Sequence, residues 1–533
     1  MNNADLIVKT MKEAGVTHCY GIPSGNVLPM LEAMRKGGIT FVLTAHEGSA
    51  SFAADVMGRL TGAPGFCIAT LGPGATNLST GVGNAYLDRS PLIALTCNLH
   101  THQLGRRIQM YIDHHTLYRP ISKASLPLRK GRVAAVLEEA MGLALSEPHG
   151  PVHLDLPEDV SLAPATEELP PIPAGKRHRP APESAFGKLE SLLQNAKRPV
   201  AVFGSTSMRM ENPSLLRAFI DRHQLPFATT TMAKGMIDED HPLSIGCIER
   251  GKRQVQREFL RSSDLILGVG YDVIEVEYEQ WIKDVPLVSV DIDPVDADSS
   301  VDIAHEVVGD LDASLKRMND MTPGSYEWPS DAALRHKERF QKALRPQVPH
   351  FAAHEAIDVV REVTPKEGIL SFDVGAHTHQ IASQWTVHDP RTFLITNGWS
   401  SMGFGLPGAI AAKLACPEKP VVALIGDGCF QMTCGEVAVA KRMGLAIPIV
   451  VLDDRWLSLI QVKQDRRDYG RYGTELQAEE YQAPPAHYFG VPAVGVRTPE
   501  ELRRALTEAF QADGPTVIEA VVDAAHYDDT VFD

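Results

Sequence analysis

The 533-residue sequence is poor in cysteine and in positive charge, and it has no long apolar run. Its 7 cysteines form no Cys-x-x-Cys pair, which argues against a disulfide framework or structural zinc and favours a reducing, cytoplasmic setting. Lys and Arg number 51 against 67 Asp and Glu, so we expect no binding to nucleic acid or to an anionic membrane surface. No stretch approaches the roughly 18–20 apolar residues of a membrane helix, and the first residues lack a signal-peptide pattern.

The composition is otherwise that of an ordinary globular protein, with 44% hydrophobic and 22% charged residues, so the chain can bury sizeable cores. Its length suggests about three domains. A proline-rich stretch at 162–182 and a second seam at 321–349 divide the sequence. We therefore expect an N-terminal domain over 1–165, a central domain over 183–330 and a C-terminal domain over 345–533.

Short runs that are apolar on both faces alternate with helical patterns in all three segments. Such runs are typical of buried parallel strands, and they occur at 66–70, 92–96, 200–203, 265–269, 421–425 and 447–452. The alternation predicts an α/β fold with three open parallel sheets.

The C-terminal segment carries a strand–helix–strand unit with acidic residues at the ends of both strands. The strand at 421–425 runs into Asp427, a helix is predicted over 433–443, and the strand at 447–452 runs into Asp454. Because the carboxyl ends of parallel strands meet at one edge of a sheet, the two carboxylates can lie side by side.

Both acids have the chemistry of a metal–phosphate site. Carboxylate oxygens at such an edge suit Mg²⁺, which takes one or two carboxylates together with phosphate oxygens. Gly426 and Gly428 flank Asp427 and let backbone N–H groups approach a phosphate. The pattern therefore indicates a site for a diphosphate and its magnesium ion.

This Gly-Asp-Gly motif and the later acidic pair resemble the diphosphate motif of thiamine-diphosphate-dependent enzymes. The branch is that of acetolactate synthase, pyruvate decarboxylase and benzoylformate decarboxylase; the resemblance covers nearly the whole chain and is closest to the acetolactate synthase large subunit. It implies pyrimidine-binding, central Rossmann-like and diphosphate-binding domains in chain order. It also implies that Asp427, Asp454 and the Trp456 carbonyl bind Mg²⁺. Asp454 departs from the usual Asn and adds a charge, and we expect the metal to be retained.

Two further C-terminal segments carry the resemblance. Asp373-x-Gly375-x-His377 is similar to a segment whose main chain and histidine approach the diphosphate. Met402, in the segment 401–407, stands where the family has a bulky apolar residue. The resemblance implies that this side chain props the cofactor in its bent shape.

The N-terminal segment resembles the half of the site that binds the aminopyrimidine. Glu47 stands where the family has a glutamate that bonds to N1′ and promotes removal of the C2 proton. Asn77 ends a Gly-Pro-Gly-x-x-Asn loop at the active-site wall, and Pro23 and Gly25 belong to an early turn near the aminopyrimidine. In the family these elements and the diphosphate site come from different subunits, which implies a homodimer or homotetramer with active sites between subunits.

Residues that select the reaction are predicted in two places. In the polar segment 98–119, Gln109 falls at the family's active-site glutamine, and His102 lies near the histidine pair of pyruvate decarboxylases. Arg106 and Lys463 could hold a second acidic group of a substrate. Ile460 replaces the glutamate of pyruvate decarboxylases, and Gly72 replaces the histidine of benzoylformate decarboxylase, which disfavours aldehyde release.

These features predict decarboxylation of a 2-oxo acid, dependent on thiamine diphosphate and Mg²⁺, with carboligation to an acceptor carbonyl. The alternatives are a simple 2-oxo acid decarboxylase, a C–C lyase or hydrolase of the same family, and a noncatalytic regulatory paralogue. Glu47 and Asp427 argue against the last. FAD in the central domain is possible but not favoured, because Gly268-Val269-Gly270 alone is weak evidence for a nucleotide site.

Overall fold

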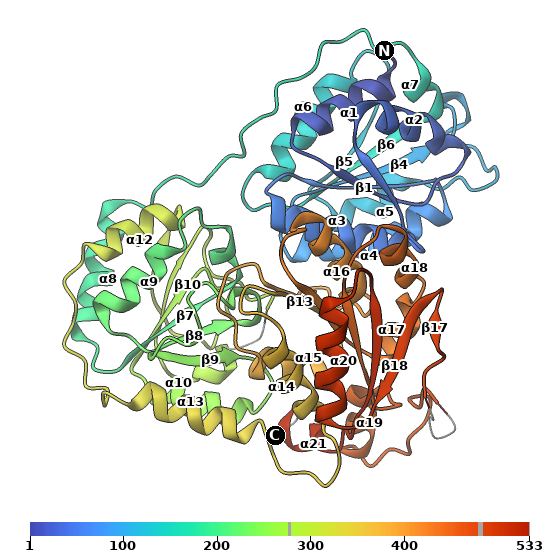
Figure 1. Ribbon diagram of the computed structural model, residues 1–533. Coiled ribbons are helices and arrows are strands. Elements are labelled where there is room, and N and C mark those ends of the chain that lie inside the picture. Colours follow the sequence, from blue (N-terminus) through green and yellow to red (C-terminus); the bar gives the residue numbers. More distant parts are fainter. Residues whose placement is uncertain (276–278, 478–482, 532–533) are drawn as a thin grey trace.

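The computed structural model describes residues 1–275, 279–477 and 483–531, and these residues form three mostly parallel sheets covered by helices (Figure 1). Within these ranges no helix is both long and apolar enough to cross a bilayer. The three-sheet α/β architecture agrees with the prediction.

The N-terminal sheet has the strand order β2-β1-β3-β4-β6-β5, and all its pairs are parallel. Its strands are β1 (His18–Gly21), β2 (Thr40–Leu43), β3 (Gly65–Ala69), β4 (Leu92–Asn98), β5 (Ala124–Pro127) and β6 (Pro151–Pro157). Its helices are α1 (Asn3–Glu13), α2 (Leu28–Gly37), α3 (Glu47–Thr61), α4 (Pro73–Leu87), α5 (His114–Tyr118), α6 (Val133–Leu145) and α7 (Glu158–Leu162).

The central sheet has the order β12-β11-β10-β7-β8-β9, so the strand order reverses between β7 and β10. Its strands are β7 (Pro199–Phe203), β8 (Phe227–Thr230), β9 (Ser244–Ile248), β10 (Leu265–Val269), β11 (Leu287–Asp291) and β12 (Ile303–Val308). Its helices are α8 (Glu183–Asn195), α9 (Ser214–His223), α10 (Arg253–Arg261), α11 (Glu279–Ile282), α12 (Leu311–Asn319) and α13 (Ala332–Ala343).

The C-terminal sheet has the order β14-β13-β15-β16-β19-β18-β17 and is parallel except for the β17–β18 pair. Its strands are β13 (Ile369–Phe372), β14 (Phe393–Leu394), β15 (Val421–Gly426), β16 (Pro448–Asp453), β17 (His487–Tyr488), β18 (Val491–Val496) and β19 (Thr516–Val521). Its helices are α14 (Ala353–Val363), α15 (Ala376–Gln384), α16 (Gly405–Ala415), α17 (Asp427–Thr433), α18 (Glu436–Arg442), α19 (Ser458–Asp465), α20 (Pro499–Gln511) and α21 (Tyr527–Thr530).

The helix predicted over 433–443 begins earlier than the sequence indicated. In the structure α17 starts at Asp427 itself and gives way to α18 after a break at 434–435. The prediction of its start was wrong because two glycines disfavour a helix, whereas an acid in the first turn favours one. Gly444 follows the end of α18, as predicted, and its left-handed φ of 65° does not continue a helix.

The N- and C-terminal domains share one hydrophobic core between helices α3 and α4 on one side and α16 on the other (Figure 1). The rings of Phe52 and Phe404 meet edge to face, 5.8 Å apart. The backbone N–H groups of Ala45 and His46 donate to the buried carboxylate of Glu436, at 3.0 and 3.2 Å. This packing brings the start of α3 next to the C-terminal sheet.

Candidate functional site

The acidic residues predicted for a metal site lie together at the carboxyl edge of the C-terminal sheet. Strands β15 and β16 pair in parallel, with Gly426 opposite Leu452. The Asp427 carboxylate accepts the backbone N–H of Arg455 at 2.9 Å, and the Asp454 carboxylate accepts that of Trp456 at 3.0 Å. A cavity of about 600 Å³ borders Asp454 and Trp456.

These carboxylates are crowded and largely removed from water. Burial, followed by the charges of Asp454 and Asp453, raises the pKa of Asp427 to about 9. Burial raises the pKa of Asp454 to about 7. Among the described residues, Oδ2 of Asp453 is buried without a hydrogen-bond partner. Three oxygen-bearing acids in one low-dielectric place form a donor set that fits a hard divalent cation.

His377 packs directly over the Gly-Asp-Gly turn. It lies in the first turn of α15, and a Cβ added to Gly426 would lie 2.8 Å from its Cε1. Burial lowers the pKa of His377 to about 4, so the ring is neutral at physiological pH. Its Nε2 is buried with no partner among the described residues, and such an orphaned polar atom fits a polar ligand group beside Gly426.

Met402 also reaches the Gly-Asp-Gly turn. Its Cε lies 3.3 Å from the position that a Cβ on Gly428 would take. The Asp373 carboxylate holds this loop by accepting the backbone N–H groups of Gly403 and Gly405, both at 2.9 Å. The structure therefore brings the predicted residues of three C-terminal segments to one place.

Glu47 is the first residue of α3 and is only 8% exposed. The Asn77 side-chain amide, in α4, donates to the Glu47 carboxylate at 3.1 Å. Gly74 lies against the same carboxylate, since its added Cβ would be 3.4 Å from Oε1. Glu47 and Asn77, predicted separately, thus form one unit.

Sequence reasoning missed Asn26 beside this unit. Its Oδ1 accepts the hydroxyls of Ser24 and Thr70, at 2.5 and 2.9 Å, which ties the turn bearing Pro23 and Gly25 to the end of β3. Its Nδ2 is buried without a partner among the described residues. The available signal was an asparagine directly after the predicted turn.

Within one chain, Asn77 and Met402 line a common cavity, whereas Glu47 and Asp427 are not among its lining residues. A cavity of about 200 Å³ lies between the starts of α3 and α4 and the 401–403 loop. Its walls include His46, Ser49, Asn77, Met402 and Thr433.

The residues predicted to select the reaction are more dispersed. His102, Arg106 and Gln109 are exposed on the segment before α5, where the Met110 backbone, not Gln109, packs against Gly72. Lys463 is half-buried on α19, and burial together with Arg250 and Arg467 lowers its pKa.

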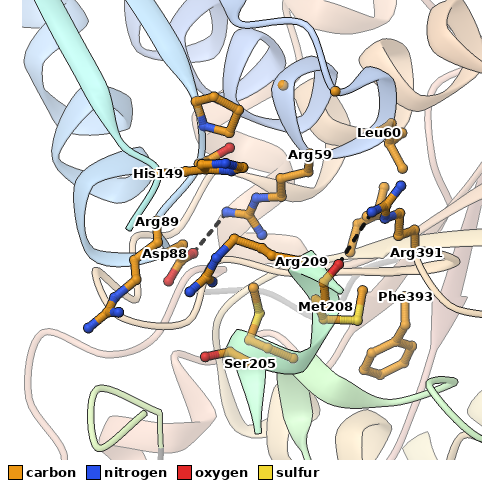
Figure 2. A pocket seen from close by; sticks show the side chains of 16 residues that line it. Arg59, Leu60, Asp88, Arg89, His149, Ser205, Met208, Arg209, Arg391 and Phe393 are labelled. Carbon is orange, nitrogen blue, oxygen red and sulfur yellow. Dashed lines mark hydrogen bonds and ion pairs between the residues drawn. The ribbon is translucent and has the colours of Figure 1, made fainter. Parts of the chain in front are cut away.

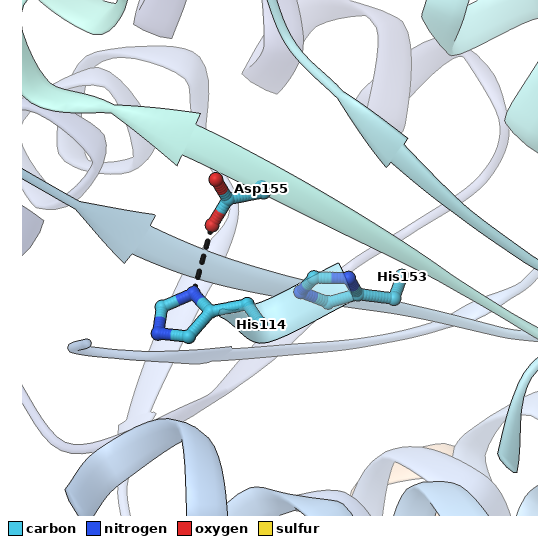
Figure 3. A group of neighbouring side chains, drawn as sticks. All are labelled: His114, His153 and Asp155. Carbon is cyan, nitrogen blue, oxygen red and sulfur yellow. Dashed lines mark hydrogen bonds and ion pairs between the residues drawn. The ribbon is translucent and has the colours of Figure 1, made fainter. Parts of the chain in front are cut away.

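A buried cluster behind the Gly-Pro-Gly turn was not predicted (Figure 3). His114 Nδ1 lies 2.8 Å from the Asp155 carboxylate, and the Thr96 hydroxyl lies 2.9, 2.8 and 3.2 Å from His114, His153 and Asp155. These three residues could in principle hold a metal ion, but the Thr96 oxygen occupies the point between them. The cluster is therefore a hydrogen-bond network, and His114 Nε2 accepts the backbone N–H of Gly72 at 3.4 Å.

At the carboxyl edge of the central sheet, two backbone N–H groups that could face a ligand donate to a glutamate side chain instead. The half-buried Glu275 carboxylate accepts the N–H groups of Ser205 at 2.7 Å and Met232 at 3.1 Å, and the Thr230 hydroxyl at 2.7 Å. Burial raises the pKa of Glu275 to about 8.

Comparison with known proteins agrees with this geometry. Family models for the N-terminal TPP binding domain, the central domain and the C-terminal TPP binding domain of thiamine pyrophosphate enzymes match residues 1–123, 187–318 and 373–520. The chain is 28% identical to the acetolactate synthase large subunit of Lactococcus lactis, over 99% of this chain and 93% of that protein. It is 29% identical to the isozyme 1 large subunit of Escherichia coli, over 98% and 94%. A probable acetolactate synthase large subunit of Methanococcus aeolicus is 28% identical over 98% and 92%. The chain belongs to the thiamine pyrophosphate enzymes and is a carboligase or decarboxylase that resembles acetolactate synthase large subunits.

Proposed function

We propose that this enzyme decarboxylates a 2-oxo acid with thiamine diphosphate and Mg²⁺ and transfers the remaining fragment to an acceptor carbonyl. The observation that carries the choice of ligation is Ile460, which is 44% exposed on α19. Release of an aldehyde requires an acid to deliver a proton, and this position offers only an apolar side chain.

Thiamine diphosphate, when bound, supplies an electron sink for the carbanion that decarboxylation leaves. Glu47 would hold a proton at the pyrimidine N1′, and its bond from Asn77 fixes the direction of the carboxylate. Asp427, Asp454 and the Trp456 carbonyl would hold Mg²⁺ against the diphosphate. Pro23 and Gly25 would border the pyrimidine, and Gly375, His377, Met402, Gly426 and Gly428 would surround the diphosphate and thiazolium.

A homodimer or homotetramer would complete the site from two subunits. Support comes from large apolar side chains left exposed around α4, where Trp399 is 40% and Met432 is 64% exposed. The Trp399 ring lies against Gly83 of α4, and Met432 borders the cavity beside Thr80. Exposed apolar side chains gathered beside a site are typical of subunit interfaces.

The residues that we propose to bind the substrate are positively charged. Lys463, with Arg250 and Arg467 nearby, would hold an acidic group of a 2-oxo acid or acceptor, and Arg106 would be a second cation for that group. Gln109 and His102 would join the site only if the segment before α5 moves inward when substrate binds.

We propose further that the central domain works without FAD. At the carboxyl edge of the central sheet, where an open α/β sheet takes a nucleotide, the backbone N–H groups of Ser205 and Met232 already donate to Glu275. The purified enzyme is therefore expected to show no flavin absorbance and to need no added FAD; dependence on FAD would contradict this.

The deciding experiment is a panel of 2-oxo acids with product identification, run with thiamine diphosphate and Mg²⁺. Formation of a 2-hydroxy-2-alkyl-3-oxo acid supports ligation, whereas stoichiometric aldehyde supports the simple decarboxylase. Calorimetric titration with thiamine diphosphate plus Mg²⁺ is the companion measurement, and absence of binding would overturn the cofactor assignment for both reactions.

A further inference from the structure

A cavity of about 140 Å³ lies where the three domains meet, apart from the site described above (Figure 2). Its walls come from the end of α3, the segment before β4, the segment after β7, and β14. Four arginines line it, two from the N-terminal domain and one from each of the others: Arg59, Arg89, Arg209 and Arg391. Asp88 is the one acidic side chain among the described lining residues.

Arg209 leaves part of its guanidinium group without an acceptor. Its Nε donates to both oxygens of Glu147, at 3.0 and 2.9 Å. Its Nη2 is buried and has no hydrogen-bond partner among the described residues. A guanidinium group stays charged and carries five N–H donors, so a buried unpaired donor is costly. Because Nη2 is closed to solvent, an anionic oxygen in the cavity would satisfy it once the Arg209 side chain turns toward that oxygen.

Arg391 is exposed and has no carboxylate partner among the described residues; its Nη2 donates to the Met208 carbonyl at 3.3 Å. Arg391 and Arg89 both adopt left-handed backbone conformations, with φ of 63° and 52°. Such values are uncommon for residues other than glycine, and strain of this kind gathers at functional sites. Arg89 already pairs with Asp272 at 2.9 Å, so Arg391 is the strained arginine whose positive charge is open to a ligand among the described residues.

The volume of the cavity and the residues that line it restrict the kinds of ligand that it can bind. A cavity of about 140 Å³ is small, which favours a small molecule over a nucleotide. Apolar atoms of Met208, Met232 and Phe393 form part of the wall. We propose that this cavity binds a small organic carboxylate, with the carboxylate on Arg209 and a short apolar body against these side chains.

This site goes beyond the proposed reaction. Because the walls belong to three domains, a ligand held there joins the central domain to the other two. A ligand that binds one domain arrangement more tightly shifts the population toward it, so the carboxylate would act as an effector.

The test is calorimetric titration of the enzyme, loaded with thiamine diphosphate and Mg²⁺, with propionate in buffer of constant ionic strength. Arg391→Gly removes the guanidinium and suits the left-handed backbone, so the fold is retained. Glu147→Gln/Arg209→Met removes both members of the ion pair and leaves no unpaired charge. We expect each variant to weaken propionate binding by about tenfold, while Arg335→Ala, an exposed arginine on α13, binds as the wild type does.

Hydrogen exchange locates the ligand. We expect propionate to protect residues 205–209 and 391–394. Equal affinity in all four proteins, or protection confined to the site around Glu47 and Asp427, would overturn the proposal. Titration with 2-oxobutanoate distinguishes two classes of effector. Binding tighter than that of propionate would identify a 2-oxo acid as the effector, and equal binding would identify a simple carboxylate.

Discussion

The backbone N–H of Gly72 donates to His114 Nε2 over 3.4 Å, which ties the turn before α4 to a buried histidine. The other ring nitrogen, Nδ1, faces the Asp155 carboxylate at 2.8 Å. A carboxylate favours the Nδ1–H tautomer, which leaves the Nε2 lone pair free for Gly72. The same turn carries Gly74, which lies against Glu47.

Two variants separate the functions of His114. His114→Gln places an acceptor near the Nε2 position and therefore keeps the hydrogen bond from Gly72. His114→Asn places a donor near the Nδ1 position and therefore keeps the hydrogen bond to Asp155. We expect kcat to fall about tenfold more in His114→Asn than in His114→Gln, by loss of a bond worth about 1 kcal/mol together with its alignment of Glu47. Hydrogen exchange of residues 71–77 in the cofactor-free protein provides a second readout. Equal kcat and equal exchange in both variants would mean that His114 only supports the fold.

Asp454→Asn tests whether the second metal ligand must be charged. The amide keeps one oxygen for the metal and removes a negative charge beside Asp427, so we expect Mg²⁺ affinity to change by about threefold or less. The metal-free variant should be more stable by about 1 kcal/mol, because a neutral amide replaces a carboxyl whose charged form is disfavoured by burial. Titration with Mg²⁺ in the presence of thiamine diphosphate checks the affinity, with the exposed Asp465→Asn as control. Loss of binding as complete as in Asp427→Ala would show that both charges are needed.

Glu436 should make stability depend on pH. Burial raises the pKa of this carboxyl from 4.5 to about 7. The folded state therefore holds the proton more tightly than the unfolded state, so the contribution to stability is complete below pH 4.5 and is lost as pH rises through 7. The loss is up to about 3 kcal/mol. We expect the wild type to lose stability relative to Glu436→Gln between about pH 4.5 and pH 7. Melting temperatures across this range check the prediction, and the exposed Glu327→Gln should follow the wild type.

Lys463→Met should change substrate preference more than turnover. The methionine keeps the apolar stem and removes the charge, so 2-oxo acids with a second anionic group should lose about tenfold in kcat/KM. A 2-oxo acid without such a group should change by less than about threefold. An equal loss for both classes would place Lys463 outside the substrate's acidic end.

The parts of the fold that could be predicted are those whose cause is local. The strands 421–425 and 447–452 were recognisable because both of their faces are apolar. The start of α17 was not, because the two glycines beside Asp427 suggest a turn until the preceding strand supplies the helix entry. His114 and Asp155 are 41 positions apart and meet only because β4 and β6 are neighbours while β5 lies at the edge. The arginine cavity depends on three domains at once, and no segment of the sequence encodes it.

Glu47 and Asp427 provide a test of the subunit arrangement. Glu47→Gln should lower activity and C2 proton exchange of the cofactor by about 100-fold or more, because a neutral amide cannot hold the proton. Asp427→Ala should abolish metal-dependent activity. If each site takes Glu47 from one subunit and Asp427 from the other, a mixed dimer contains one site with both defects and one intact site. Co-expression of the two variants would then restore roughly a quarter of wild-type activity, since half of randomly paired dimers are mixed. Co-expression that stays as inactive as either variant alone, in a sample whose mixed dimers are verified by two affinity tags, would show that each subunit builds its site alone.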